Sequence, residues 1–284
     1  MTLQGKLAEA ALLARPNILS TDDGVELFYR DWGRAEGAPV VFLAGWGLNT
    51  DIWGALMQGL VEEGRRCVAY DRRGHGRSSD PGRDYGFDRL ADDLAAVLEG
   101  LDLTGATLVG HSMGAGEIVR YLSRHGSARV GKVVFVGAAL PCLGWRDDNP
   151  TGAPPEAFDQ LRAVFKADFP GWMAANARPF VTPDTSEATI DWVKAMMTQA
   201  SFQALIETNK ALTAADFRGE LARLDLPVLM LHGDAEASAP LETCGRATSA
   251  LLKNGRLDVY PGGPHGLMLT HSERMRTDIG TFVG

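Results

Sequence analysis

The chain alternates short apolar segments with segments of helical periodicity through its first half and again near its end. Strand-like runs occur at "ELFYRDW", "PVVFLAGW", "RRCVAYD", "ATLVGHS" and "KVVFVGAAL", and helical spacing appears near Asp51 to Glu62, near Arg89 to Leu98 and from Gly114 onward. Strands that alternate with helices are typical of a mostly parallel sheet covered by helices, because parallel strands need a crossover connection. The sequence therefore predicts an α/β fold.

The alternation stops after "KVVFVGAAL" and resumes at "LPVLMLHG". The interval 141–225 opens with four prolines, reads as several helices, and holds six of the eleven Phe and three of the six Trp. These aromatic residues either form a core within the insertion or line a pocket beneath it. We expect a core of residues 17–140 and 226–284, a helical cap of 141–225, and an N-terminal extension of 1–16 that forms a surface helix ending at Pro16.

Composition limits the partners of the protein. There are 36 acidic and 28 basic residues, and the net charge of -8 argues against nucleic acid or an anionic membrane as a main partner. No apolar run approaches the roughly 20 residues that a membrane span needs. Cys67, Cys142 and Cys244 are widely spaced and form no disulfide or zinc pattern, which favours a reducing cytoplasm. A small neutral or weakly polar molecule is the expected partner, and self-association is left open.

Ser112 lies between two glycines in "LVGHSMGAGE". The pattern G-x-S-x-G is short, and such a serine can simply bond to its own backbone in a turn. Here "ATLVG" is typical of a buried strand and "AGEIVRYLSRHG" of a helix, so Ser112 falls at the strand-to-helix turn. Gly110 and Gly114 remove side chains that would collide there. The context favours a nucleophile presented to a cleft at a helix N-terminus.

A serine nucleophile needs a base, and the base needs a carboxylate that orients it. His265, in "LDVYPGGPHGLMLTH", follows a strand and a glycine-proline turn, and we predict that it is the base. The acid is expected in "HGDAEASAP", where Asp234 and Glu236 compete, because the end of "KVVFVGAAL" carries no carboxylate.

The other histidines are expected to have structural roles. His75 should shape the loop after "CVAYD", and His111 should turn away from the reacting centre. His125 and His232 are interpreted as structural, and His271 as part of the solvated face of the final helix.

With the order Ser112, acidic loop, His265, the chain resembles an α/β-hydrolase. More narrowly, it resembles the cofactor-free bacterial haloperoxidases, perhydrolases and aryl esterases, through "YDRRGHGRSSDP", "LADDLAAVLEGLDL", "GEIVRYLSRHG", "LPVLMLHGDAE" and "GGPHGLMLTH". The resemblance implies a Ser112 nucleophile, a His265 base and neither metal nor organic cofactor. Its pattern G-x-x-D-x-x-x-P, counted from Gly233 to Pro240, places the acid at Glu236, so glutamate replaces the usual aspartate.

The same resemblance implies that the backbone N–H groups of Trp46 and Met113 hold the oxyanion. The Trp46 indole is expected to wall the acyl pocket rather than only pack in the core. Further candidates for the pocket come from the cap: Trp145, Phe165, Trp172, Phe180 and Trp192. Ala44 and Gly47 replace the family's usual histidine and proline around Gly45 and Trp46, which predicts a looser or differently supported oxyanion loop.

These residues predict a serine hydrolase that cleaves carboxylic esters of small, fairly apolar substrates through an acyl-enzyme. Peracid formation is expected when hydrogen peroxide replaces water. Lactones and carbon-carbon bonds are alternative substrates for the same triad, whereas haloalkane or epoxide chemistry would place aspartate at position 112. A rival of another class is a ligand-binding or receptor protein on a hydrolase scaffold, which the altered acid and oxyanion loop favour.

Overall fold

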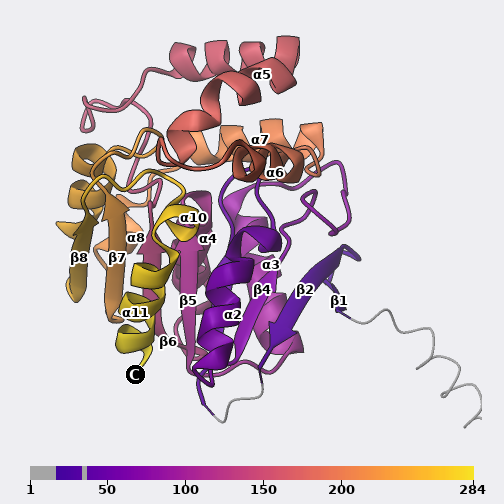
Figure 1. Ribbon diagram of the computed structural model, residues 1–284, viewed down its shortest axis with the longest axis vertical. Helices are drawn as coiled ribbons and strands as arrows, with labels where there is room; N and C mark the ends of the chain where they lie inside the picture. The colour runs from indigo at the N-terminus through magenta and orange to yellow at the C-terminus, as the bar shows by residue number, and fades with distance from the viewer. Residues whose placement is uncertain (1–16, 34–36) are drawn as a thin grey trace, which may run out of the picture.

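The computed structural model describes residues 17–33 and 37–284, so the expected helix within residues 1–16 lies outside the described residues. Within them, eight strands form one sheet in the order β1-β2-β4-β3-β5-β6-β7-β8 (Figure 1). The strands are β1 Ile18–Ser20, β2 Glu26–Trp32, β3 Val40–Leu43, β4 Cys67–Tyr70, β5 Ala106–His111, β6 Val130–Val136, β7 Val228–Gly233 and β8 Gly255–Tyr260. β1 and β2 are antiparallel to their neighbours, and β3 to β8 pair in parallel.

Helices cover both faces of the sheet. One face carries α3 and α4, and the other carries α2 and α11. Because side chains alternate along a strand, Leu108 of β5 packs on the first face and Val109 on the second. This double burial explains why the central strands are continuous apolar runs. The core helices are η1 Thr50–Trp53, α2 Gly54–Glu62, α3 Phe87–Gly100, α4 Met113–His125, η3 Leu241–Arg246, α9 Ala247–Ser249, α10 Leu267–Thr270 and α11 Ser272–Val283.

The interval between β6 and β7 contains α5 Pro155–Asn176, η2 Arg178–Phe180, α6 Glu187–Met197, α7 Phe202–Ala214 and α8 Arg218–Leu221. Figure 1 shows α5, α6 and α7 as a layer beyond one end of the sheet. α5 is kinked at Asp168, two residues before Pro170, and the Asp168 carboxylate accepts from the Gly171 N–H at 2.9 Å. No helix among the described residues is long and apolar enough to cross a bilayer.

Candidate active site

The turn between β5 and α4 holds Ser112 in a strained backbone conformation, with φ 51° and ψ -115°. The flanking glycines allow this turn because other backbone approaches them closely. A Cβ on Gly110 would lie 2.7 Å from the Ala115 nitrogen, and a Cβ on Gly114 would lie 2.7 Å from the Leu43 oxygen. Ser112 is therefore held at the N-terminus of α4, where the helix dipole favours negative charge.

His265 and Glu236 meet from neighbouring loops at the same edge of the sheet. His265 lies between β8 and α10, Glu236 follows β7, and His265 Nδ1 is 2.6 Å from Glu236 Oε2. An ionised carboxylate can only accept, so the proton is assigned to Nδ1 and the lone pair to Nε2. The other carboxylate oxygen, Oε1, accepts from the Ser238 N–H at 2.7 Å and the Ala239 N–H at 3.0 Å. Both oxygens of Glu236 thus have fixed partners.

The Glu236 carboxyl remains ionised although it is buried. Burial acts to raise its pKa, but the charge and hydrogen bond of His265 and the backbone N–H groups of Ala239 and Ser238 outweigh burial, and the pKa lies below its ordinary value. Asp234 is exposed and accepts from the Gly262 N–H at 2.6 Å, in the turn after β8. Of the two competing carboxylates, the structure brings Glu236 to His265 and leaves Asp234 outside.

Ser112 and His265 line one cavity of about 450 Å³ beneath the helices of the 141–225 interval. Four of the predicted pocket residues line it as well: Trp46, Phe165, Trp172 and Phe180. The Trp46 ring stacks on that of Phe165 with centroids 5.2 Å apart, and its Nε1 donates to the Leu205 oxygen on α7 at 2.9 Å. Trp46 therefore connects the loop after β3 to the helices above it.

Two predicted pocket residues do not line this cavity, so the prediction is wrong for Trp145 and Trp192. Trp192 is 41% exposed on α6, because the next residue, Val193, faces inward and successive helical residues point about 100° apart. Trp145 is 48% exposed. Its backbone N–H donates to the backbone oxygen of Ala153 at 2.8 Å, within the same loop. Trp145 thus belongs to a loop between β6 and α5 that pairs with itself, and not to one of the helices over the cavity.

The two predicted oxyanion donors come from the residue after Ser112 and from the loop after β3. Met113 is the first residue of α4, and Trp46 follows β3, which pairs directly with β5. Within the described part of the chain, neither backbone N–H donates a hydrogen bond. Both N–H groups are therefore available to a developing oxyanion.

Arg72 holds the oxyanion loop, which is the loop after β3 that carries Trp46. The sequence did not predict this role. Its guanidinium donates to the Ala44 oxygen at 2.6 Å and the Gly45 oxygen at 3.2 Å, and it pairs with Glu117 of α4. The Nε to Glu117 Oε1 distance is 2.8 Å, and both side chains are almost fully buried. Arg72 thus joins the loop of Trp46 to the helix that begins after Ser112. The only sequence signal was an arginine in "YDRRGHG" and a glutamate within an apolar helix face.

Replacing Arg72 with leucine should lower the free energy of unfolding by about 3–5 kcal/mol, because Glu117 would remain buried without a counter-charge. Arg124, which pairs with Asp92 at the surface at 2.9 Å, provides the matched control. Arg124→Leu should cost no more than about 1 kcal/mol. Urea unfolding measures both variants, and equal losses would contradict a special role for the Arg72 pair.

His111 lies beside the reacting residues, contrary to the prediction that it turns away. It lines the cavity, its ring centroid is 4.5 Å from that of His265, and its Nε2 donates to the His265 backbone oxygen at 3.1 Å. Burial, together with His265, holds the pKa of His111 well below its ordinary range, so the ring is neutral. His111 therefore positions the backbone of the base without competing for its proton.

The remaining histidines lie outside the cavity. His75 is buried and bonds to the Arg73 oxygen at 3.1 Å, and burial lowers its pKa to about 3. His232 bonds to the Ala239 oxygen at 2.7 Å, and His125 pairs with Asp92 at 2.8 Å. His271 precedes α11 and is half-buried, so its expected place on a solvated helix face is wrong. Its ring packs against Tyr260 instead.

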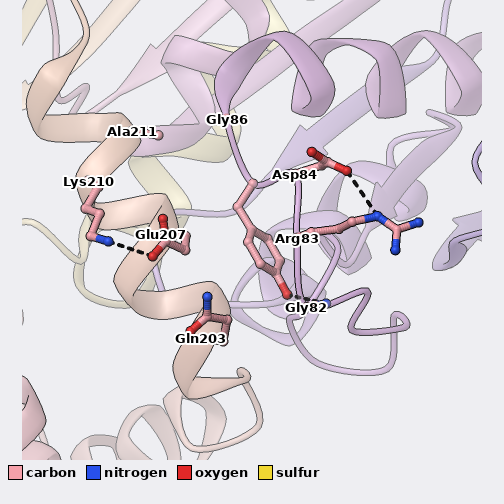
Figure 2. A pocket seen from close by; sticks show the side chains of 9 residues that line it. Gly82, Arg83, Asp84, Gly86, Gln203, Glu207, Lys210 and Ala211 are labelled. Atoms are coloured by element: carbon pink, nitrogen blue, oxygen red, sulfur yellow. Dashed lines mark hydrogen bonds and ion pairs between the residues drawn. The ribbon is translucent and has the colours of Figure 1, made fainter.

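A second hollow of about 410 Å³ lies between the loop Gly82–Gly86 and α7 (Figure 2). Its charged side chains are paired, Lys210 with Glu207 at 2.7 Å and Arg83 with Asp84 at 3.3 Å. None of Ser112, His265 or Glu236 lines it. Among the described residues, no group of three or more His, Cys, Asp or Glu side chains is arranged to hold a metal ion. We therefore place the chemistry in the larger cavity.

A strained serine that shares a cavity with a carboxylate-bound histidine, at one edge of a parallel sheet, defines the class of serine hydrolases with an α/β scaffold. The family comparison agrees, since the model of the alpha/beta hydrolase fold family matches residues 38–272. The chain belongs to this family, and the predicted α/β-hydrolase fold is confirmed.

Individual relatives show which members of the family the chain resembles. The chain is 39% identical over 275 residues to a non-heme chloroperoxidase from Streptomyces lividans, with 93% of this chain and 98% of the relative covered. It is 37% identical to a bifunctional esterase/perhydrolase from Acinetobacter calcoaceticus, with the same coverage. Among solved structures, an esterase from Exiguobacterium antarcticum has a TM-score of 0.90 at 30% identity and covers 95% of this chain and 99% of its own. The predicted resemblance to haloperoxidases, perhydrolases and esterases is thus confirmed.

Proposed function

We propose that the protein hydrolyses carboxylic esters of small, fairly apolar substrates through an acyl-enzyme on Ser112. The observation that carries the proposal is the 2.6 Å bond between His265 and Glu236 in a cavity that Ser112 also lines. The names of the relatives, an esterase/perhydrolase and an esterase, support it. The apolar walls of the cavity and its moderate volume favour small substrates.

In the first half of the reaction, His265 Nε2 takes the proton of Ser112 Oγ as that oxygen attacks the ester carbonyl. The Trp46 and Met113 N–H groups hold the negative charge of the tetrahedral intermediate. Glu236 stabilises the imidazolium, which then gives its proton to the departing alcohol. In the second half, His265 removes a proton from water, the hydroxide attacks the acyl-enzyme, and the carboxylic acid leaves as Ser112 regains its proton.

The relatives favour perhydrolysis as a second activity of the same site. One is named a bifunctional esterase/perhydrolase, and another a chloroperoxidase. If hydrogen peroxide replaces water in the second half-reaction, the acyl-enzyme gives a peracid and free Ser112.

We also propose a cytoplasmic location, supported by three cysteines that are buried and form no disulfide.

Purified protein should hydrolyse 4-nitrophenyl acetate and butanoate without added metal, and a chelator should leave the rate unchanged. Release of 4-nitrophenolate measures hydrolysis, and adding hydrogen peroxide should divert part of the acyl groups into peracid. Ser112→Ala protein is the control for both products. If wild-type protein turns over no ester or lactone in such a panel, the receptor alternative is favoured.

A further inference from the structure

One buried polar side chain in the cavity wall has no role in the mechanism above. Asn209 lies on α7, is 7% exposed, and lines the same cavity as Ser112. The other polar residues of the wall away from Ser112, His111 and His265 are exposed or half-buried: Asn176, Lys194, Thr213 and Ser238. Among the polar wall residues other than Ser112, His111 and His265, Asn209 is therefore the one for which an unmet hydrogen bond costs most.

The contacts of Asn209 determine which way its amide faces. Arg162 Nη1, on α5, donates to Asn209 Oδ1 at 3.0 Å. A guanidinium has no acceptor, so the amide oxygen must face Arg162 and the NH₂ group must face away from it. Arg162 itself is held by Asp159 at 2.7 Å and by the Thr213 hydroxyl at 3.2 Å. The orientation of the Asn209 amide is thus fixed by an anchored neighbour.

The two N–H groups of Asn209 Nδ2 have no acceptor among the described residues. Among the described residues, the Asn209 side chain has one hydrogen-bond partner, Arg162, and it is bound through Oδ1. The Nδ2 atom is not sealed in the protein interior without a partner, as the buried nitrogens of His75 and His232 are. Since Asn209 is 7% exposed and lines the cavity, we assign these free donors to the cavity side.

We propose that Asn209 Nδ2 donates to a second oxygen of the substrate. The preferred substrates are then esters or lactones that carry a keto, ether or hydroxyl oxygen apart from the ester group. This inference rests on the proposed ester hydrolysis and narrows its substrate class. A substrate without the second oxygen buries the two N–H groups unpaired, which should reduce kcat/KM by about tenfold to a hundredfold.

The test compares pairs of esters that have nearly the same shape and differ in one acceptor oxygen. For the acyl side, these are 4-nitrophenyl 3-oxobutanoate, 4-oxopentanoate and 5-oxohexanoate, each beside the ester with a methyl branch in place of the keto oxygen. For the alcohol side, 2-methoxyethyl acetate is compared with butyl acetate. The ratio of kcat/KM within each pair is measured for wild type and variants, so that differences in intrinsic reactivity cancel.

Two Asn209 variants change the donor in different ways. Asn209→Asp keeps the size and the acceptor for Arg162 but replaces the NH₂ group with an oxygen, which repels an acceptor. Asn209→Leu removes both functions at similar volume. Asp159→Ala is the matched control, because it removes another acceptor of Arg162, held at 2.7 Å, and Asp159 is exposed and does not line the cavity.

Both Asn209 variants should lower the ratio of at least one pair by about tenfold or more, with the larger change in Asn209→Asp, and Asp159→Ala should keep the wild-type ratio. Thermal unfolding of each variant verifies that it is folded. Unchanged ratios in every pair, with turnover retained, would overturn this inference and leave the proposed function standing. An equal loss in Asp159→Ala would overturn it too, since the anchoring of Arg162 would then explain the effect. Absence of ester turnover in wild type would overturn both proposals.

Discussion

Ser112→Ala should lower the turnover of 4-nitrophenyl acetate by at least ~10⁴-fold. Alanine cannot form the acyl-enzyme, and what remains is the catalysis by the oxyanion donors and by binding alone. The fold should survive, because the turn depends on the close approaches at Gly110 and Gly114 rather than on the hydroxyl. Steady-state kinetics measures the loss, with urea unfolding to verify stability.

Labelling supplies an independent control for the nucleophile. A fluorophosphonate should add covalently to Ser112 in the wild type, with the modified peptide located by mass spectrometry, and should leave Ser112→Ala protein unmodified. Activity retained at about a tenth of the wild-type value would contradict the assignment, since no triad nucleophile is dispensable to that degree.

Glu236→Gln should reduce kcat by up to ~10⁴-fold at unchanged size. Oε1 of Glu236 accepts from the N–H groups of Ser238 and Ala239, so the oxygen of a glutamine would be placed there. Its NH₂ group would then face His265 Nδ1. That nitrogen would have to accept, the proton would move to Nε2, and the base toward Ser112 would be lost.

Asp234→Asn is the matched control for the acid, because the same change of charge is made two residues away in the same loop. Asp234 bonds to the Gly262 N–H, and an asparagine oxygen can accept that bond as well. We expect activity close to wild type. If the two variants exchanged these phenotypes, Asp234 would be the working acid and the arrangement around Glu236 would be structural.

Local patterns were enough to predict the elements that carry the nucleophile. The run "ATLVGH" forms β5, and Ser112 follows this strand directly. A strand buried on both faces has to be apolar throughout, and a sharp turn against β3 needs glycine at positions 110 and 114. Both constraints act on neighbouring residues, so they are visible in the order of amino acids alone.

The choice between Asp234 and Glu236 as the triad acid does not follow from local patterns alone. The spacing from Gly233 to Pro240 indicated Glu236, but Asp234 remained a candidate because both carboxylates are in one loop. The contact that separates them joins Glu236 to a residue 29 positions away. Which of two nearby side chains reaches a partner on another loop depends on the direction of the backbone, and periodicity does not report that direction.

The alternation of strands and helices, the strained turn at Ser112 and the apolar composition of the inserted helices follow from the sequence, because each reflects the conformational and burial preferences of adjacent residues. The three-dimensional packing decided that Trp145 and Trp192 face solvent, that Arg72 supports the oxyanion loop, and that Asn209 faces the cavity with its orientation set by Arg162. The roles of Arg72 and Asn209 depend on pairs 28, 45 and 47 residues apart in the chain. Such pairs are formed by the relative placement of whole elements, which no short stretch of sequence encodes.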